Sequence, residues 1–149
     1  MKISTKGRYA LRLMLDLALQ SDGQPIPLRD VARRQDISDK YLEQIVAQLG
    51  RAGLVRSVRG AGGGYLLTRP ASEQTVGEIL RAVEGSLSPV SCAEDPTCCG
   101  RAEHCVTMEV WTKINDAISS VVDNMTLQEL VDRSHSKCGD CEQNLDLPL

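Results

Sequence analysis

The 149-residue chain contains no phenylalanine and no long apolar run. Aromatic residues make up 3% of the sequence, so its core must be built from aliphatic side chains. No segment approaches the roughly 18 apolar residues of a membrane span. The start of the chain alternates charged residues with leucine and lacks the apolar stretch of a signal peptide. We therefore expect a cytoplasmic protein with no membrane partner.

Histidine is equally scarce, because His104 and His135 are the only two. No Ser-His-Asp or paired-carboxylate arrangement can be assembled from the sequence, so we do not expect an enzyme. Cysteine, by contrast, occurs six times. In a reducing compartment such thiols more often bind a metal or a cluster, or act in redox chemistry, than form disulfides.

The formal net charge of -3 hides an asymmetry. Residues 1–69 hold 12 Lys and Arg against 6 Asp and Glu, whereas the remainder holds 5 against 14. A basic half joined to an acidic half is typical of a DNA-binding head on a body that does not bind DNA. Charge alone is also compatible with a solvated surface that has no partner.

Apolar residues at helical spacing predict three helices in the basic half, over residues 5–20, 28–35 and 38–50. Ser38 is a good N-cap for the third of them. Two short helices joined by a tight turn match a helix-turn-helix. Two alternating strands follow, at residues 54–58 and 64–68, and predict a β-hairpin wing.

The turn of the wing, Arg59 to Gly64, contains four glycines. A glycine-rich loop can cradle a phosphate, but this one lacks the Lys-Ser/Thr of a P-loop and no helix starts right after it. The fold class predicted for the whole chain is mainly α with a small β-hairpin, a winged helix-turn-helix followed by a long C-terminal dimerisation helix.

The acidic half begins with a capping box, Thr75 and Glu78, that opens a helix over residues 76–84. A polar, cysteine-dense loop comes next, and from Val106 an apolar stripe recurs at close to heptad spacing, which favours a dimerisation helix over packing within one subunit. The expected division is a DNA-binding domain at 1–70, a linker helix at 71–91, a cysteine-rich cluster-binding loop at 92–105, a dimerisation helix with a short cap at 106–133, and a flexible tail at 134–149.

Four segments resemble one family of winged-helix regulators, the family that includes IscR, NsrR and CymR. They are the opening KISTKGRYALRLMLDLA, the block SDKYLEQIVAQLGRAGLVRSVRGAGGGYLL, the VGEIL helix and the cysteine loop before VW. The resemblance runs from Met1 to about Val131 and is nearest to the IscR type. It implies a homodimeric repressor and activator that binds double-stranded operator DNA, senses iron-sulfur cluster status and controls cluster-assembly genes. An iron-sulfur assembly scaffold is a further candidate partner.

The resemblance also implies which residues contact DNA. The helix at 38–50 would enter the major groove, the wing would reach the minor groove, and the start of the chain would hold the backbone. The residues implied are Lys40, Tyr41, Glu43 and Gln44 on the helix, Arg59 and Gly60 in the wing, and Ser4, Thr5, Lys6 and Arg56 at the backbone. For Tyr41, one turn before Ile45, packing in the core is an equal alternative.

IscR-type regulators bind a [2Fe-2S] cluster through three cysteines and a histidine three residues after the third. Cys92, Cys98 and Cys105 occupy the matching places, although Cys99 could replace Cys98. Met108 stands where the histidine is expected, and a thioether is a poor ligand for ferric iron. The other candidates for the fourth ligand are His104, Glu109 and Cys99.

Other chemistries remain open. The NsrR type senses nitric oxide through a [4Fe-4S] cluster held partly by an Asp, whose place here is taken by Arg8. The CymR type controls cysteine metabolism and lacks the cysteine triad. Four of the six thiols could instead hold a structural zinc ion, either in a regulator or in a protein-interaction module, and Cys138 and Cys141 have the spacing of a zinc or thiol-disulfide pair.

Overall fold

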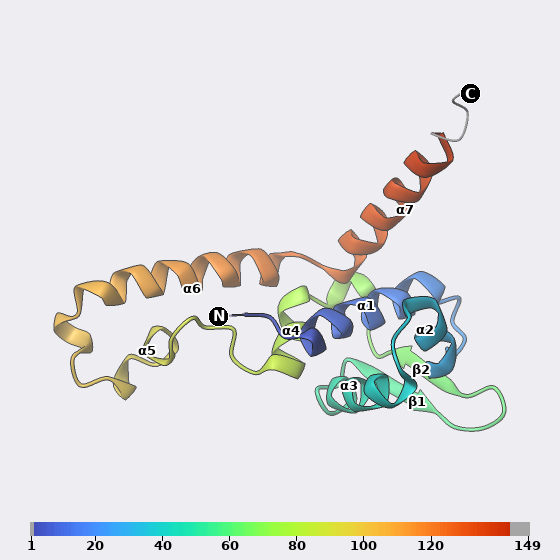
Figure 1. Cartoon of the computed structure of the whole chain (residues 1–149), viewed down its shortest axis with the longest axis horizontal. Coiled ribbons are helices and arrows are strands. Elements are labelled where there is room, and N and C mark those ends of the chain that lie inside the picture. The colour runs from blue at the N-terminus through green and yellow to red at the C-terminus, as the bar shows by residue number, and fades with distance from the viewer. Residues whose placement is uncertain (1, 144–149) are drawn as a thin grey trace.

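Helix α1 (Thr5–Gln20) is the element around which the rest of the head is assembled. Its buried apolar residues, Ala10, Leu13, Met14 and Leu17, recur every three or four positions. In the computed structural model, residues 2–143 of the chain are described, with side chains for residues 2–137. Figure 1 shows a head that contains α1 to α4 and the hairpin, and an arm, residues 85–125, that extends away from it.

Helices α2 (Leu28–Gln35) and α3 (Asp39–Arg51) form the predicted helix-turn-helix. Between them Asp36 adopts the left-handed conformation, with φ of 53°, which reverses the chain within three residues. Ser38 caps α3 as predicted, because its hydroxyl accepts a hydrogen bond from the backbone N–H of Tyr41 at 3.3 Å.

Strands β1 (Val55–Val58) and β2 (Gly64–Leu67) form the predicted antiparallel hairpin, with Val55 opposite Leu67. Gly60 has φ of +109°, which favours glycine at the turn. Gly64 lies so close to the backbone of Ile26 that a Cβ would meet its carbonyl oxygen at 2.3 Å. The hairpin is therefore fixed to the segment before α2 as well as to α3.

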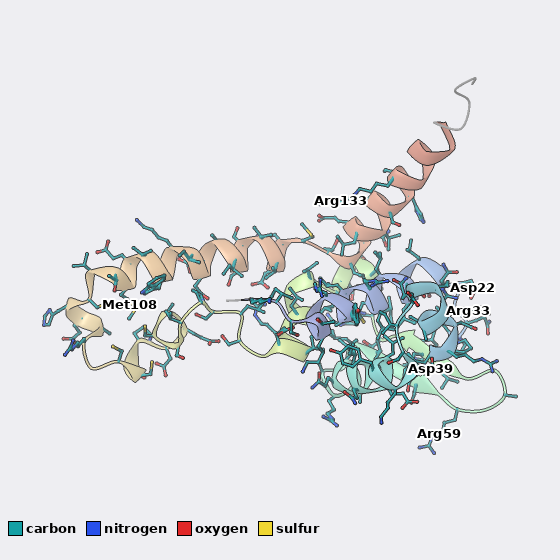
Figure 2. The ribbon with its side chains drawn as sticks, in the orientation of Figure 1. Asp22, Arg33, Asp39, Arg59, Met108 and Arg133 are labelled. Atoms are coloured by element: carbon teal, nitrogen blue, oxygen red, sulfur yellow. The ribbon has the colours of Figure 1, made fainter. Side chains whose placement is uncertain are left out.

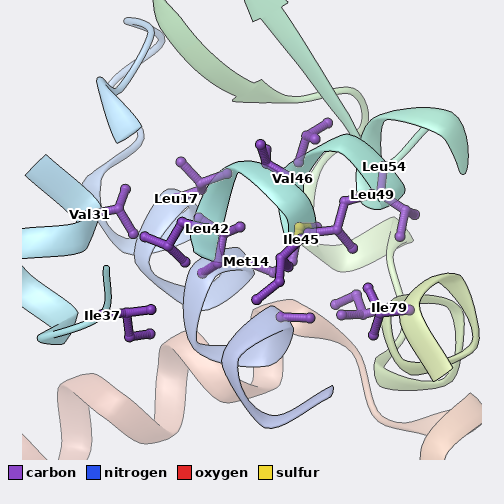
Figure 3. Close-up of a cluster of buried hydrophobic side chains, with 14 of the residues drawn as sticks. Met14, Leu17, Val31, Ile37, Leu42, Ile45, Val46, Leu49, Leu54 and Ile79 are labelled. Atoms are coloured by element: carbon purple, nitrogen blue, oxygen red, sulfur yellow. The ribbon is translucent and has the colours of Figure 1, made fainter. Parts of the chain in front are cut away.

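The core lies where α1 and α3 meet α4 (Val76–Glu84) (Figure 3). It is almost entirely aliphatic, as the composition requires. The capping box of Thr75 and Glu78 is present at the start of α4. Leu127, at the start of α7 (Leu127–Gln143), completes the cluster from the far end of the chain.

The arm contains three short helical turns and one long helix. The turns are α5 (Ser91–Glu94), η2 (Pro96–Cys98) and η3 (Ala102–His104), so the predicted irregular loop has more local helix than expected. The long helix is α6 (Val106–Asn124). A further single turn, η1 (Ala71–Glu73), precedes α4 in the head.

Helix α7 is longer than the predicted cap. The sequence prediction ends helix at residue 133, whereas α7 continues to Gln143 and leaves the head in a different direction from α6 (Figure 1). Residues 134–143 contain no proline that would stop it. Residues 144–149 of the predicted tail, and the side chains of Cys138 and Cys141, lie outside the described part of the chain.

The mainly α-helical fold with one small hairpin is confirmed. Among the described residues, no helix combines the length and the apolar character that crossing a membrane requires.

Truncating Ile45 to alanine should lower the free energy of unfolding by about 2–5 kcal/mol, because this side chain of α3 is fully buried in the core. Urea denaturation followed by circular dichroism measures this change. Arg133→Ala is the control, since Arg133 is exposed and makes only a long ion pair with Glu129, and it should shift stability by less than about 0.5 kcal/mol. Equal effects of the two substitutions would contradict the assignment of the core.

Candidate nucleic-acid interface and cysteine loop

Helix α3 buries one face and exposes the other. Leu42 and Ile45 pack inward, whereas Lys40, Glu43 and Gln44 are exposed on the outer side. These three outer side chains line a shallow, open concavity. No other described part of the chain covers this exposed face, which is therefore accessible to a DNA duplex.

Tyr41 takes part in packing within the head. Its ring lies edge-on against Tyr9, with the ring centroids 5.7 Å apart, and both rings pack against the core. Arg12 in turn lies over the ring of Tyr9, 5.4 Å from its centroid. The ring of Tyr41 therefore packs against the core, which was one of the two alternatives for this residue. Contact of its hydroxyl with DNA stays a prediction.

The turn of the hairpin carries Arg59 at its edge. Figure 2 shows this side chain pointing away from the body of the protein. Arg56, Arg59 and Gly60 are all exposed, and neither arginine forms an ion pair within the described residues. An unpaired guanidinium on a thin projection has the shape and charge that suit a narrow minor groove.

At the start of α1 the structure shows a contact that the sequence did not predict. The carboxylate oxygen Oε1 of Glu84 accepts hydrogen bonds from the Ser4 hydroxyl at 2.5 Å, the Ser4 N–H at 3.1 Å and the Gly7 N–H at 2.9 Å. The hydroxyl and the N–H of Ser4 are therefore already hydrogen-bonded within the protein. Of its predicted neighbours at the DNA backbone, Thr5 is exposed and Lys6 half-buried.

An ion pair holds α2 against α1. The carboxylate of Asp16 is buried and receives Arg34 Nε at 3.2 and 3.0 Å on its two oxygens, together with Gln35 Nε2 at 2.9 Å. The hydrogen bond to Asp16 raises the pKa of Arg34. Because the pair is multiply bonded, it fixes the position of the helix-turn-helix on α1.

The four thiols of the arm lie in the segment that joins α4 to α6. Cys92 is in α5, Cys98 ends η2, Cys99 follows directly, and Cys105 is the N-cap of α6. Cys98 is exposed and the other three are half-buried. In the part of the chain that the structure describes, no three His, Cys, Asp or Glu side chains are gathered closely enough to hold a metal ion.

The pKa values of two of these thiols are shifted in opposite directions. A hydrogen bond with Thr107, with the sulfur 3.2 Å from Oγ1, and the backbone N–H of Met108 lower the pKa of Cys105. Partial desolvation and the negative charges of Asp95, Cys92 and Cys99 raise the pKa of Cys98. Cys105 therefore forms a thiolate more readily than Cys98 does.

Three candidates for the fourth ligand lie within four residues of Cys105 in the sequence. His104 and Glu109 are exposed, and Met108 is half-buried in the first turn of α6, at the end far from the head (Figure 2). The Met108 N–H donates to the carbonyl of Cys105 at 3.0 Å.

The inner end of α6 is fastened to α4. Arg81 donates to both carboxylate oxygens of Asp123, at 2.5 and 3.0 Å, and lowers the pKa of Asp123. A Cβ at Gly77 would lie 2.0 Å from Asp123 Oδ1 and 3.1 Å from Val122. A larger residue at position 77 would have to push the Asp123 carboxylate aside, so glycine leaves room for the contact of Asp123 with Arg81.

Comparison with known proteins places this geometry among transcription regulators. The family model described as "Rrf2: Iron-dependent Transcriptional regulator" matches residues 3–133. The HTH-type transcriptional regulator IscR of Escherichia coli is 45% identical over 131 residues, covering 88% of this chain and 80% of that protein.

Two solved structures share the fold. CymR, the global cysteine regulator of B. subtilis, is 42% identical with a TM-score of 0.74, over 89% of this chain and 98% of that one. IscR of T. potens is 40% identical with a TM-score of 0.73, over 90% of this chain and 88% of that one.

Removing the wing cation tests the interface. Arg59→Ala should weaken binding to a duplex selected by the wild-type protein from a random library, by about 1–3 kcal/mol, because one groove contact is lost. Fluorescence anisotropy measures the affinity. Arg133→Ala, an exposed arginine on α7, is the matched control and should bind as the wild type does. Unchanged affinity of Arg59→Ala would remove the wing from the interface.

Proposed function

Because the chain belongs to the Rrf2 family of iron-dependent transcriptional regulators, we propose that it acts as a cytoplasmic homodimer that binds operator DNA and senses iron-sulfur cluster status. The sensing group proposed is a [2Fe-2S] cluster in the loop at 92–105, and the regulated genes are those of cluster assembly. An iron-sulfur assembly scaffold is the proposed source of the cluster.

The observation that carries the proposal is the coexistence, in one chain, of an uncovered helix-turn-helix with a cationic wing and a separate loop rich in thiols. In this proposal Lys40, Glu43 and Gln44 meet the major groove and Arg59 the minor groove. The exposed carboxylate of Glu43 repels phosphate, so it restricts the bases that α3 accepts to those that offer a donor.

The dimer is proposed from the outer face of α6. Val106 and Val121 are 79% and 59% exposed, and Val110 and Ile114 lie between them on the same face. The adjoining face, which includes Ile118 and Val122, packs against α4 and its surroundings. Apolar residues exposed along a 19-residue helix are an unfavourable surface for a monomer, and a second copy of α6 would cover them.

The donor set of the loop fits an iron-sulfur cluster. Thiolates are the usual ligands of such clusters, and Cys105 is shifted toward its thiolate form by its hydrogen bonds. Cys92, Cys98 and Cys105 would hold the group, with Cys99, His104, Met108 or Glu109 as the fourth ligand. Whether the loop holds a cluster would depend on the supply of iron and sulfide and on oxidants.

A series of contacts within the chain would transmit a change in the cysteine loop to α3. Cys105 occupies the N-cap position of α6, and the other end of α6 is held to α4 by Arg81 and Asp123. Helix α4 reaches α1 through Glu84, and α1 packs against α3. A change in the loop would thus alter the disposition of two α3 helices in a dimer and the affinity for one class of operator.

The similarity to B. subtilis CymR favours a second candidate function, a clusterless or zinc-bound regulator of cysteine metabolism. It would use the same DNA-binding head. Its thiols would respond by oxidation or by binding zinc.

Replacing one thiol distinguishes these functions. Wild-type protein purified without oxygen should absorb between about 320 and 460 nm and contain iron and sulfide in equal amounts. Cys92→Ala should lose both the absorbance and the iron, because one of three cysteine ligands is gone. Colourless wild-type protein containing zinc or no metal would favour the second candidate, and a full spectrum in Cys92→Ala would place the ligands elsewhere.

A charge on the outer face of α6 tests the dimer. Ile114→Asp should convert a dimer into a monomer in light scattering after size exclusion, because a carboxylate would be buried among apolar side chains. Asp116→Ala, an exposed position at the side of the same helix, is the control and should stay dimeric. A dimeric Ile114→Asp protein would assign the interface to another surface.

A further inference from the structure

The exposed surface of α3 extends beyond Gln44, the last residue of this helix that was predicted to contact DNA. The concavity on its outer face is lined by residues spaced three or four apart along the whole helix, namely Lys40, Glu43, Gln44, Ala47, Gln48 and Arg51. A helix of 13 residues is about 20 Å long, and the predicted contacts occupy only its first half. Three residues in the second half therefore lie on the same surface with no function assigned to them.

Gln48 carries an unsatisfied polar atom on this surface. Its Oε1 atom is shielded from solvent and has no hydrogen-bond partner within the described residues, although the residue as a whole is half-buried. Hiding an acceptor without a partner is unfavourable, because the atom has lost its hydrogen bonds to water. A side chain in this state gains free energy by turning outward to a donor, and the amide can also donate through Nε2.

Arg51 is a cation at the end of this exposed surface. It lies in the last turn of α3, is exposed, and forms no ion pair among the residues that the structure describes. The nearest carboxylate on its own helix, Glu43, is eight residues away, which corresponds to about 12 Å along the axis. Its charge is therefore available to an external anion.

We propose that the DNA-reading surface runs the full length of α3, with Gln48 reading a base edge and Arg51 contacting a phosphate at the end of the same groove. Ala47 lines the same concavity, and its small side chain would let the backbone of α3 come close to the groove floor. Glutamine pairs with adenine through one acceptor and one donor, which are the two groups that the Gln48 amide offers. This inference rests on the proposed DNA-binding function and extends it to a longer half-site.

The experiment compares three single variants of the full-length protein, Gln48→Ala, Arg51→Ala and the control Arg133→Ala. The wild type first selects its preferred duplex from a random library, and anisotropy then measures binding of each variant to that duplex and to an unselected duplex over a range of salt. A random-library selection repeated with Gln48→Ala reports base preference directly. Gln48→Met, which keeps the volume of the half-buried side chain, separates loss of the amide from loss of packing.

Each residue has its own expected result. Arg51→Ala should weaken binding to both duplexes by a similar factor and reduce the slope of log affinity against log salt by about 1, because one phosphate contact is lost. Gln48→Ala and Gln48→Met should bind the selected duplex about 5- to 150-fold more weakly and accept other bases at one position of each half-site.

The outcomes separate the inference from the function on which it rests. Failure of the wild type to select any duplex would overturn the DNA-binding function itself. A wild type that selects a duplex, with Gln48→Met keeping its preference at every base, would overturn the role of Gln48. An unchanged salt slope and affinity in Arg51→Ala would overturn the role of Arg51.

Discussion

Two backbone hydrogen bonds close the arm onto the head, and the positions of α6 and α7 on the head depend on them. The Val76 N–H donates to the carbonyl of Met125 at 2.9 Å, and the Leu127 N–H donates to that of Gln74 at 2.8 Å. Gln74 is completely buried, so sliding one segment past the other would leave buried polar groups without partners. The 40 residues between Gly85 and Asn124 can therefore extend from the head and still return to one fixed place.

The other end of the arm is held by a carboxylate. Glu84 ends α4, where a negative charge opposes the dipole of its own helix, but its oxygen lies at the N-terminus of α1, where the dipole favours it. Two residues later the Ser86 hydroxyl donates to Glu94 of α5 at 2.5 Å. Both ends of the arm thus meet α4, and α4 lies against α1, which bears α2 and α3. Packed helices therefore connect the arm to α3 without a break.

The parts of this structure that were predicted from sequence have local signals. Ser38 and Thr75 cap helices through atoms three residues away, and apolar periodicity marks α1 and α3 without knowledge of their neighbours. The contact of Glu84 with Ser4 joins residues 80 apart and has no such signal. The apolar stripe of α6 was predicted as one surface, whereas the structure divides it into a face packed on the head and an exposed face. Periodicity gives the width of a stripe, but only the position of α4 decides how much of it is covered.

The cysteine loop has the least support from the rest of the protein. The backbone hydrogen bonds between Val90 and Cys105 all join residues three or four apart, and none of its short helical turns contains a buried residue. Local turns of this kind open at low free energy, because few contacts break when they do. Its conformation can therefore be set by whatever binds the thiols, whereas the bidentate contact of Arg81 with Asp123 keeps the inner end of α6 in place. Because the loop is weakly held and the inner end of α6 is firmly anchored, the outer end of α6 can change its degree of order while the head stays folded.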